Sequence, residues 1–400
     1  MAYTPPERIL KRYADLLVNF ALNGGKGIKK GEVVFLQIPE CAKPILLPLR
    51  ESVLKAGGFP IIEYLPDDVA RHFYENASED QLLFFPEFYL KGKVEQADHF
   101  LHIIAETDKH ELETIDPKKI MVRSKAWKPY KDWRDEKENA GKLTWTLGLY
   151  GTEAMAKEVS LSLEDYWEQI TKACYLDDEN PVETWRGIEK QISEIKEKLN
   201  NLKIEKLHLV SKDTDLMVKI GKNRKWLGGS GRNIPSFEVF ISPDWRGTEG
   251  VIQFNQPLYR YGNLIKNVRL VFKEGCVVEC SASQGEEVLK EMVATVGAEK
   301  VGEFSLTDSR LSRITKFMGE TLYDENVGGV NGNTHIALGS AYKDTFPGDP
   351  SVVTKEQWDE MGYNDSVVHT DIISTENRKV TAYLEDGTKK VIYENGVFTL

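Results

Sequence analysis

Cysteine is scarce in this chain of 400 residues, which contains only Cys41, Cys174, Cys276 and Cys280. Scattered residues of this kind are too few for the disulfide framework of a small secreted protein, and they provide no cluster of thiolates for zinc. The reducing interior of a cell suits this composition best, so we expect a cytoplasmic protein.

Long apolar runs are also missing from the sequence. No stretch approaches the roughly 20 apolar residues that a membrane-spanning helix needs, and the mean hydropathy is −0.41. Pro5 and Pro6 precede charged helical turns, which is not the pattern of an export signal. We therefore interpret the N-terminal segment as the first helix and expect no membrane partner.

An excess of basic residues is the third feature that the chain lacks. Lysine and arginine number 52 against 63 aspartates and glutamates, which gives a net charge of −11. Nucleic acid is not an expected partner, because phosphate binding needs a concentrated basic face. Residues 118–134 do combine bases with aromatic rings, and we interpret them as a solvated face or a subunit contact. The surplus carboxylates can instead bind a cation.

The first part of the chain has the pattern of an α/β fold. Short apolar runs typical of buried strands alternate with segments of helical periodicity. Such alternation predicts a parallel sheet with right-handed crossover helices, so we expect a Rossmann-like N-terminal domain over residues 1–180. The predicted helices are residues 7–22 and 42–56, and the predicted strands are residues 33–38, 60–64 and 99–105.

A change of pattern near residue 181 marks the expected domain junction. Apolar residues recur at three- and four-residue steps over residues 181–201, which predicts a long amphipathic helix. Beyond it, short apolar runs between glycine, asparagine and proline predict antiparallel strands, so we expect a mixed α+β domain over residues 181–400. Its predicted strands are 207–211, 216–220, 238–241, 251–254, 268–272 and 277–280, with a helix at 285–296 and a hairpin at 380–383 and 391–393.

Three segments resemble parts of well-known motifs but lack the spacing or the residues that those motifs require. The glycine-rich residues 24–27 lack the spacing of a phosphate-binding loop, so they predict a connecting loop. His110 and Glu111 begin a zinc-protease motif, but Thr114 stands where its second histidine belongs. Ser230 lies in a glycine-rich run without the last glycine of a nucleophile elbow, so we interpret that run as a turn.

A histidine and an aspartate near the C-terminus form the sharpest chemical signal. His369 and Asp371 lie two residues apart in an apolar run, so a strand would place both side chains on one face. An imidazole and a carboxylate together suit a divalent cation such as zinc, cobalt or manganese. A His–Asp hydrogen bond without a metal explains the same residues, and the pattern alone leaves both interpretations open.

A glycine-rich loop precedes another histidine, His335. Residues 327–333 contain three glycines, which indicates backbone that bends sharply or approaches another group closely. A simple hairpin turn explains the loop equally well.

Short motifs spread over nearly the whole chain follow one another in a specific order. This series resembles the thermophilic-type metallo-aminopeptidases, the family that includes aminopeptidase T and aminopeptidase S. Each motif is short, but their order and spacing together are specific. They are residues 148–159 with Thr152-Glu153-Ala154, Thr214-Asp215-Leu216, residues 233–240, Gly302-Glu303-Phe304, Asp324-Glu325-Asn326, residues 335–342 and His369-Thr370-Asp371.

The resemblance implies a co-catalytic metallo-aminopeptidase that removes the N-terminal residue of short peptides. It implies two divalent cations per chain, of zinc, cobalt or manganese, and a homodimer whose N-terminal domains screen the active sites. In this interpretation Glu303 also takes a proton from the attacking water, and Tyr342 donates a hydrogen bond to the oxyanion. The implied metal ligands are Glu238, Glu303, His335, His369 and Asp371.

One position departs from the family pattern. The family carries a further metal-binding glutamate five residues before the histidine, where this chain has Val330. Because valine cannot bind a metal, the resemblance predicts weakened occupancy of the second metal position. Glu325 would supply the carboxylate only if the loop folded back, and we do not expect it to do so.

Two other functions are compatible with parts of the pattern. A ring-cleaving dioxygenase resembling the dihydroxypyridine dioxygenases would hold one Fe(II) with two histidines and one aspartate. Such a site needs no glutamates, so Glu238 and Glu303 favour the aminopeptidase. A non-catalytic relative that holds a structural metal is the second alternative, and Val330 is the residue that favours it.

Overall fold

The computed structural model of the chain describes residues 3–229 and 231–400, so the turn predicted at Ser230 lies outside the described residues. The chain forms two compact units. The first comprises Met1–Lys190, Gly229–Ser236 and Met318–Tyr323, and the second comprises Gln191–Gly228, Phe237–Phe317 and Asp324–Leu400. No helix among the described residues is both long and apolar enough to span a membrane.

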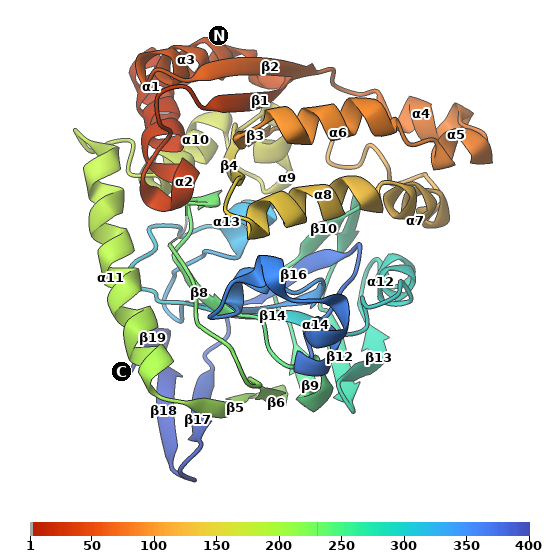
Figure 1. Ribbon diagram of the computed structural model, residues 1–400, viewed down its shortest axis with the longest axis vertical. Coiled ribbons are helices and arrows are strands. Elements are labelled where there is room, and N and C mark those ends of the chain that lie inside the picture. The colour runs from red at the N-terminus through yellow and green to blue at the C-terminus, as the bar shows by residue number, and fades with distance from the viewer. Residues whose placement is uncertain (1–2, 230) are drawn as a thin grey trace. The chain divides into compact units, whose positions relative to one another are not determined.

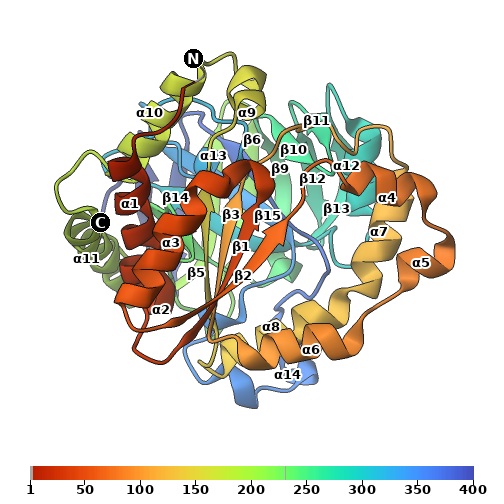
Figure 2. The same cartoon turned by 90° about the horizontal axis from the view of Figure 1, so that it is seen from above.

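The first unit is built on a parallel five-stranded sheet with the order β2-β1-β3-β4-β7. Figure 2 shows α1 and α3 on one side of this sheet and α6 and α8 on the other. A sheet covered on both faces explains the nearly continuous apolar run of β1. Its strands are β1 (Val33–Pro39), β2 (Phe59–Leu65), β3 (His99–Ile104), β4 (Thr144–Leu149) and β7 (Asn233–Ile234).

The helices of the first unit alternate with its strands (Figure 1), as the sequence pattern predicts. The predicted helix over residues 7–22 is α1 followed by a π-helical turn, Leu17–Ala21, whose residues are mostly buried. These helices are α1 (Glu7–Leu16), α2 (Leu22–Gly25), α3 (Lys43–Lys55), α4 (Ala70–Asn76), α5 (Glu79–Leu83), α6 (Glu87–Gln96), α7 (Pro117–Ala126), α8 (Lys128–Asn139), α9 (Glu153–Glu158) and α10 (Leu163–Ala173). Most of α13 (Thr321–Asp324) also belongs to this unit.

The helix α11 (Pro181–Asn201) contains the boundary between the units. Its predicted apolar stripe is largely buried, with Trp185, Ile188, Ile192 and Leu199 each at most 5% exposed. The amphipathic pattern therefore identifies this helix correctly.

The second unit holds an eight-stranded and a four-stranded sheet, both antiparallel, together with one separate hairpin. The larger sheet has the order β13-β12-β9-β6-β5-β17-β18-β19 and the smaller sheet β16-β15-β14-β8. The strands of the larger sheet are β5 (Ile204–Ser211), β6 (Thr214–Lys219), β9 (Glu249–Gln253), β12 (Arg269–Lys273), β13 (Cys276–Ser281), β17 (Lys379–Leu384), β18 (Lys389–Glu394) and β19 (Val397–Phe398).

The smaller sheet carries the residues of chemical interest. It consists of β8 (Glu238–Ile241), β14 (Val301–Thr307), β15 (Asn333–Gly339) and β16 (His369–Ser374). The other elements of this unit are the hairpin strands β10 (Leu258–Arg260) and β11 (Asn263–Ile265) and the helices α12 (Glu286–Val293) and α14 (Lys355–Met361). A parallel-sheet unit followed by a mixed α+β unit confirms the expected fold class.

Candidate metal centre

The strand register of the smaller sheet places all five predicted ligands on one face. Ala337 on β15 is paired with Glu303 on one side and with Asp371 on the other. Residues that pair directly across strands share a face, and so do residues two apart on one strand. The ligands that this register gathers are Glu238, Glu303, His335, His369 and Asp371.

A bulge at Gly302 interrupts β14 directly beside Glu303. Val301 pairs with Leu338 and Glu303 pairs with Ala337, so Gly302 is an extra residue in β14. Glu303 keeps the register of the rest of the strand and shares a face with Ser305, whereas the bulge shifts the register of Val301. A Cβ atom at Gly302 would lie 2.4 Å from the main-chain oxygen of Ser340, so only glycine fits there.

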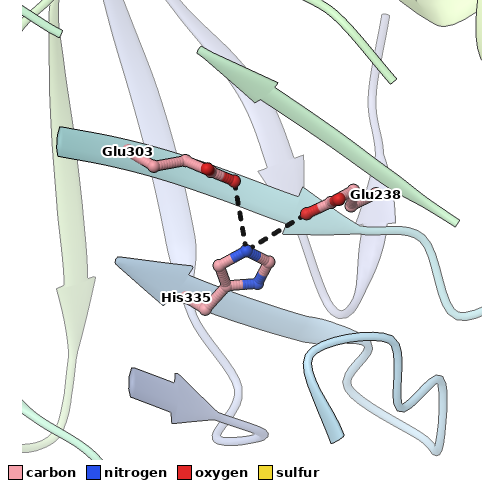
Figure 3. Close-up of side chains that lie close together, drawn as sticks. All are labelled: Glu238, Glu303 and His335. Atoms are coloured by element: carbon pink, nitrogen blue, oxygen red, sulfur yellow. Dashed lines mark ion pairs between the residues drawn. The ribbon is translucent and has the colours of Figure 1, made fainter. Parts of the chain in front are cut away.

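The side chains converge around the two histidines. Nε2 of His335 lies 3.1 Å from Oε2 of Glu238 and 3.4 Å from Oε1 of Glu303 (Figure 3). Nε2 of His369 lies 3.5 Å from Oε2 of Glu303 and 3.6 Å from Oδ1 of Asp371. The two oxygens of Glu303 therefore face different histidines.

Glu325 belongs to the same cluster, contrary to the expectation from sequence. It follows α13 directly, is only 4% exposed, and lies with His335 and Asp371 in a group whose ligand atoms are within 4.8 Å of one another. Val330 is 90% exposed. The loop does fold back, so a further carboxylate comes to the cluster from Glu325 and not from position 330.

The folded loop depends on a close backbone approach at Gly332. This glycine has a φ of +57°, and a Cβ atom there would lie 2.4 Å from the main-chain oxygen of Thr307. The left-handed conformation and the close approach both require glycine. The glycines of this loop therefore do more than form a simple turn.

Burial and mutual repulsion shift the pKa values of the cluster. Burial raises the pKa of Glu325 well above its usual range, and the negative charges of Glu238 and Asp371 add to the effect. Burial lowers the pKa of His335, but the proximity of Glu238 and Glu303 outweighs it and raises that pKa well above the usual value. In Asp371 the cation of His369 outweighs burial and lowers the pKa to about 2.

These shifts indicate that the cluster stabilises positive charge at its centre. Four carboxylates meet two imidazoles there, and despite burial these carboxylates raise the pKa values of His335 and His369 well above the usual value. A divalent cation would offset the same negative charge.

Neighbouring residues orient the ligands. Nδ1 of His369 lies 2.8 Å from the main-chain oxygen of Ser340, and because a carbonyl only accepts, the proton is on Nδ1 and Nε2 is available to a metal. The Ser305 hydroxyl donates to Oε2 of Glu238 over 3.1 Å. Asn326 accepts a hydrogen bond of 2.6 Å from the main-chain N–H of Phe237, the residue before Glu238. Ser340 and Asn326 lie within motifs noted in the sequence, but no pattern there indicated that these residues or Ser305 support the ligands.

The donor set fits a divalent cation of the zinc, cobalt or manganese kind. Both ring nitrogens of His335 are buried, and neither makes a hydrogen bond of normal geometry to a described residue. Buried polar atoms rarely lack a partner, and imidazole nitrogens with carboxylate oxygens are the ligands that these cations prefer. The residues at this site are therefore chemically suited to hold the implied metal.

Tyr342 lies beside the cluster, which is where the family resemblance places it. Its ring centroid is 4.8 Å from that of His369 in an edge-to-face arrangement and 5.6 Å from that of Phe240. Its main-chain N–H donates to the Ser242 hydroxyl over 2.8 Å, which fixes the start of the segment after β15. The tyrosine is thus held against one of the predicted metal ligands.

Comparison with known proteins assigns the family. The model of the thermophilic metalloprotease (M29) family matches residues 7–398. The chain belongs to this family. Among its relatives, aminopeptidase AmpS of Bacillus subtilis (strain 168) is 28% identical over 410 residues, which cover 97% of each chain. Aminopeptidase T of Thermus thermophilus is 29% identical over 415 residues, which cover 96% of this chain and 98% of that one.

A solved structure supports the same assignment. Wild-type AmpT from Thermus thermophilus matches this chain with a TM-score of 0.84 and 26% identity, over 98% of this chain and 100% of that one. Membership of the M29 family confirms the resemblance drawn from the short motifs, and it implies that the protein binds a divalent metal.

Proposed function

We propose that this M29 metallo-aminopeptidase removes the N-terminal residue of short peptides with a water molecule activated by two divalent cations. Membership of the family and the names of the relatives support the aminopeptidase activity. The position of Glu303 supports the use of two cations, because its two oxygens face different histidines.

The proposed ligands divide into two sets that share Glu303. One set is Glu238, Glu303 and His335, and the other is Glu303, His369 and Asp371. Glu325 adds a carboxylate close to His335 and Asp371. When bound, two such cations polarise the scissile carbonyl and lower the pKa of a water molecule toward 7.

The protein's own groups complete the proposed reaction. Glu303 takes a proton from the attacking water and passes it to the leaving amine, which requires one of its oxygens to be free at that moment. The Tyr342 hydroxyl donates a hydrogen bond to the oxygen that gains negative charge. His369 keeps its orientation because its Nδ1 proton stays bonded to the main chain of Ser340.

Replacing Tyr342 with phenylalanine should slow the chemical step while leaving the metal in place. Loss of one oxyanion donor typically lowers kcat about 10²–10³-fold, whereas the ring contact with His369 is kept. The measurement is kcat, KM and metal content on one preparation of Tyr342→Phe. A fully metallated variant with nearly the kcat of the wild type would give Tyr342 a purely structural role.

The geometry argues against the two alternative functions. An Fe(II) dioxygenase site with two histidines and one aspartate has no use for Glu238, Glu303 and Glu325, all of which are buried in the cluster. Structural zinc sites are usually closed and rich in cysteine, and all four cysteines of this chain are free.

Cleavage of matched substrates tests the proposed activity directly. Leucyl- and arginyl-p-nitroanilide should be hydrolysed after zinc, cobalt or manganese is added back to chelated protein. Their N-acetylated counterparts should not be hydrolysed, because an aminopeptidase requires a free N-terminal amine. Equal cleavage of blocked and free substrates would contradict an aminopeptidase.

Three further features belong to the same proposal. We expect the physiological metal to be zinc, cobalt or manganese, the protein to act as a homodimer, and its location to be the cytoplasm. The catalytic groups all come from residues 181–400, the proposed catalytic domain.

A further inference from the structure

Arg260 lies beside the metal centre without being one of its proposed ligands. It is the last residue of β10, in the hairpin that β10 forms with β11 (Figure 2). The segment leading to it runs along the outer edge of β16. Gln256 donates its main-chain N–H to the oxygen of Ile373 over 3.3 Å, and Nη2 of Arg260 donates to the main-chain oxygen of His369 over 3.2 Å.

Not every hydrogen-bond donor of the Arg260 guanidinium has a partner among the described residues. Its Nε is buried and makes no hydrogen bond to a described residue. The group also lies 4.8 Å from the centroid of the Tyr261 ring, a contact that orients a planar guanidinium. An arginine held in place with a buried donor left over is suited to bind an additional acceptor.

The electrostatic setting suggests which acceptor this is. The positive charge of Arg260 lies close to the cluster, because its Nη2 donates to the main chain of His369. Four carboxylates surround the proposed reaction centre, so an anionic group on a substrate would be repelled there without a nearby cation. A guanidinium pairs with a carboxylate through two parallel hydrogen bonds and thus provides such a cation.

Bond lengths limit how far that carboxylate lies from the reacting bond. In a dipeptide three covalent bonds, together about 4 Å long, separate the scissile carbonyl carbon from the terminal carboxylate carbon. Arg260 contacts the main chain of His369, whose ring belongs to the cluster. The carboxylate of a dipeptide is thus the one that lies nearest to the reacting bond, whereas that of a longer peptide would lie further away.

We propose that Arg260 is a specificity-determining residue that binds the free C-terminal carboxylate of dipeptide substrates. This inference rests on the proposed aminopeptidase activity and adds a preference for dipeptides with an unblocked C-terminus.

The test compares leucylglycine with leucylglycine amide as substrates of the metal-loaded protein. The wild type should prefer the free acid. In Arg260→Gln the kcat/KM for the acid should fall about 10–100-fold, mainly through KM, because a hydrogen-bonded charge pair is lost. The kcat/KM for the amide should fall much less, so the ratio of kcat/KM for the acid to that for the amide should approach one. Arg260→Lys should recover part of the preference, since it restores the charge without the paired donors.

A second arginine of the same unit provides the control. Arg269 on β12 faces Glu279 over 3.7 Å, and Arg269→Gln should change neither rate. If Arg260→Gln lowered kcat/KM equally for both substrates, Arg260 would only hold β16 in position through His369, and the inference would be overturned. A wild type without preference for the acid would overturn it as well. Failure of the wild type to cleave either substrate would overturn the proposed function itself, and this inference with it.

Discussion

Replacing His335 with alanine should remove bound metal and hydrolytic activity together. The imidazole lies between Glu238 and Glu303, so its loss leaves these carboxylates without the neutral nitrogen ligand that holds a cation among them. His369→Ala should have the same effect on the second set of ligands. Metal content by elemental analysis and the rate of leucyl-p-nitroanilide hydrolysis should both fall close to background.

His208 offers a matched control for these variants. It lies on β5 in the same unit and pairs with Asp215 over 2.7 Å, away from the metal cluster. His208→Ala should therefore keep both metal and activity. Far-ultraviolet circular dichroism should show that all three variants remain folded. Unchanged metal content in His335→Ala would remove that histidine from the proposed site.

Replacing Glu303 with glutamine should lower both metal content and turnover. The carboxylate faces both histidines, and a neutral amide would offset less of the positive charge of two cations. An amide also cannot accept the proton from the attacking water, and loss of a general base typically lowers kcat about 10²–10⁴-fold. The measurement is kcat at saturating added metal, together with the metal content of the isolated variant.

Glu279 is a suitable control for Glu303, because it is an exposed strand glutamate in the same unit. Glu279→Gln should leave metal content and kcat as in the wild type. If Glu303→Gln kept full metal and nearly the wild-type kcat, Glu303 would be neither the shared ligand nor the base.

Local periodicity predicted the part of the site that lies on one strand. Alternation along residues 366–373 places His369 and Asp371 on one face, and the register of β16 confirms this. The remaining ligands came from the resemblance to a family, because Glu238, Glu303 and His335 lie on three different strands. No local pattern reports which strands become neighbours.

Two features of the site could not be predicted, for a common physical reason. Gly302 changes the register of β14 by one residue, and Gly332 lets the loop before β15 pack against Thr307. Both depend on close backbone contacts between segments distant in sequence. The sequence shows the glycines but not the partners, and for that reason the position of Glu325 was predicted wrongly.

The helices between β2 and β3 show a different limit of the sequence pattern. Along α6 the apolar Phe88 is 94% exposed, whereas the charged Lys93 is 8% exposed and pairs with Glu63. Hydrophobic periodicity identifies a helix by apolar residues on its buried face and charged residues on its exposed face. Because Phe88 and Lys93 have the opposite arrangement, the pattern did not predict this helix.

The position of Glu325 in the cluster leads to a prediction about the number of bound metal ions. If this buried carboxylate replaces the one expected at position 330, Glu325→Gln should weaken binding of one of the two cations. Val330→Glu adds a carboxylate to an exposed position and should bring no gain in metal content or rate. A gain in Val330→Glu would show instead that the exposed loop reaches the metal centre.

The central claim is that hydrolysis depends on two cations held by this cluster, and a metal titration tests it most directly. Chelated protein is titrated with zinc, cobalt or manganese while bound metal and the hydrolysis of leucyl-p-nitroanilide are followed on the same samples. We predict no activity without metal and a rise in rate that ends at two equivalents per chain. Full activity in metal-free protein, or at one equivalent, would contradict the two-cation mechanism.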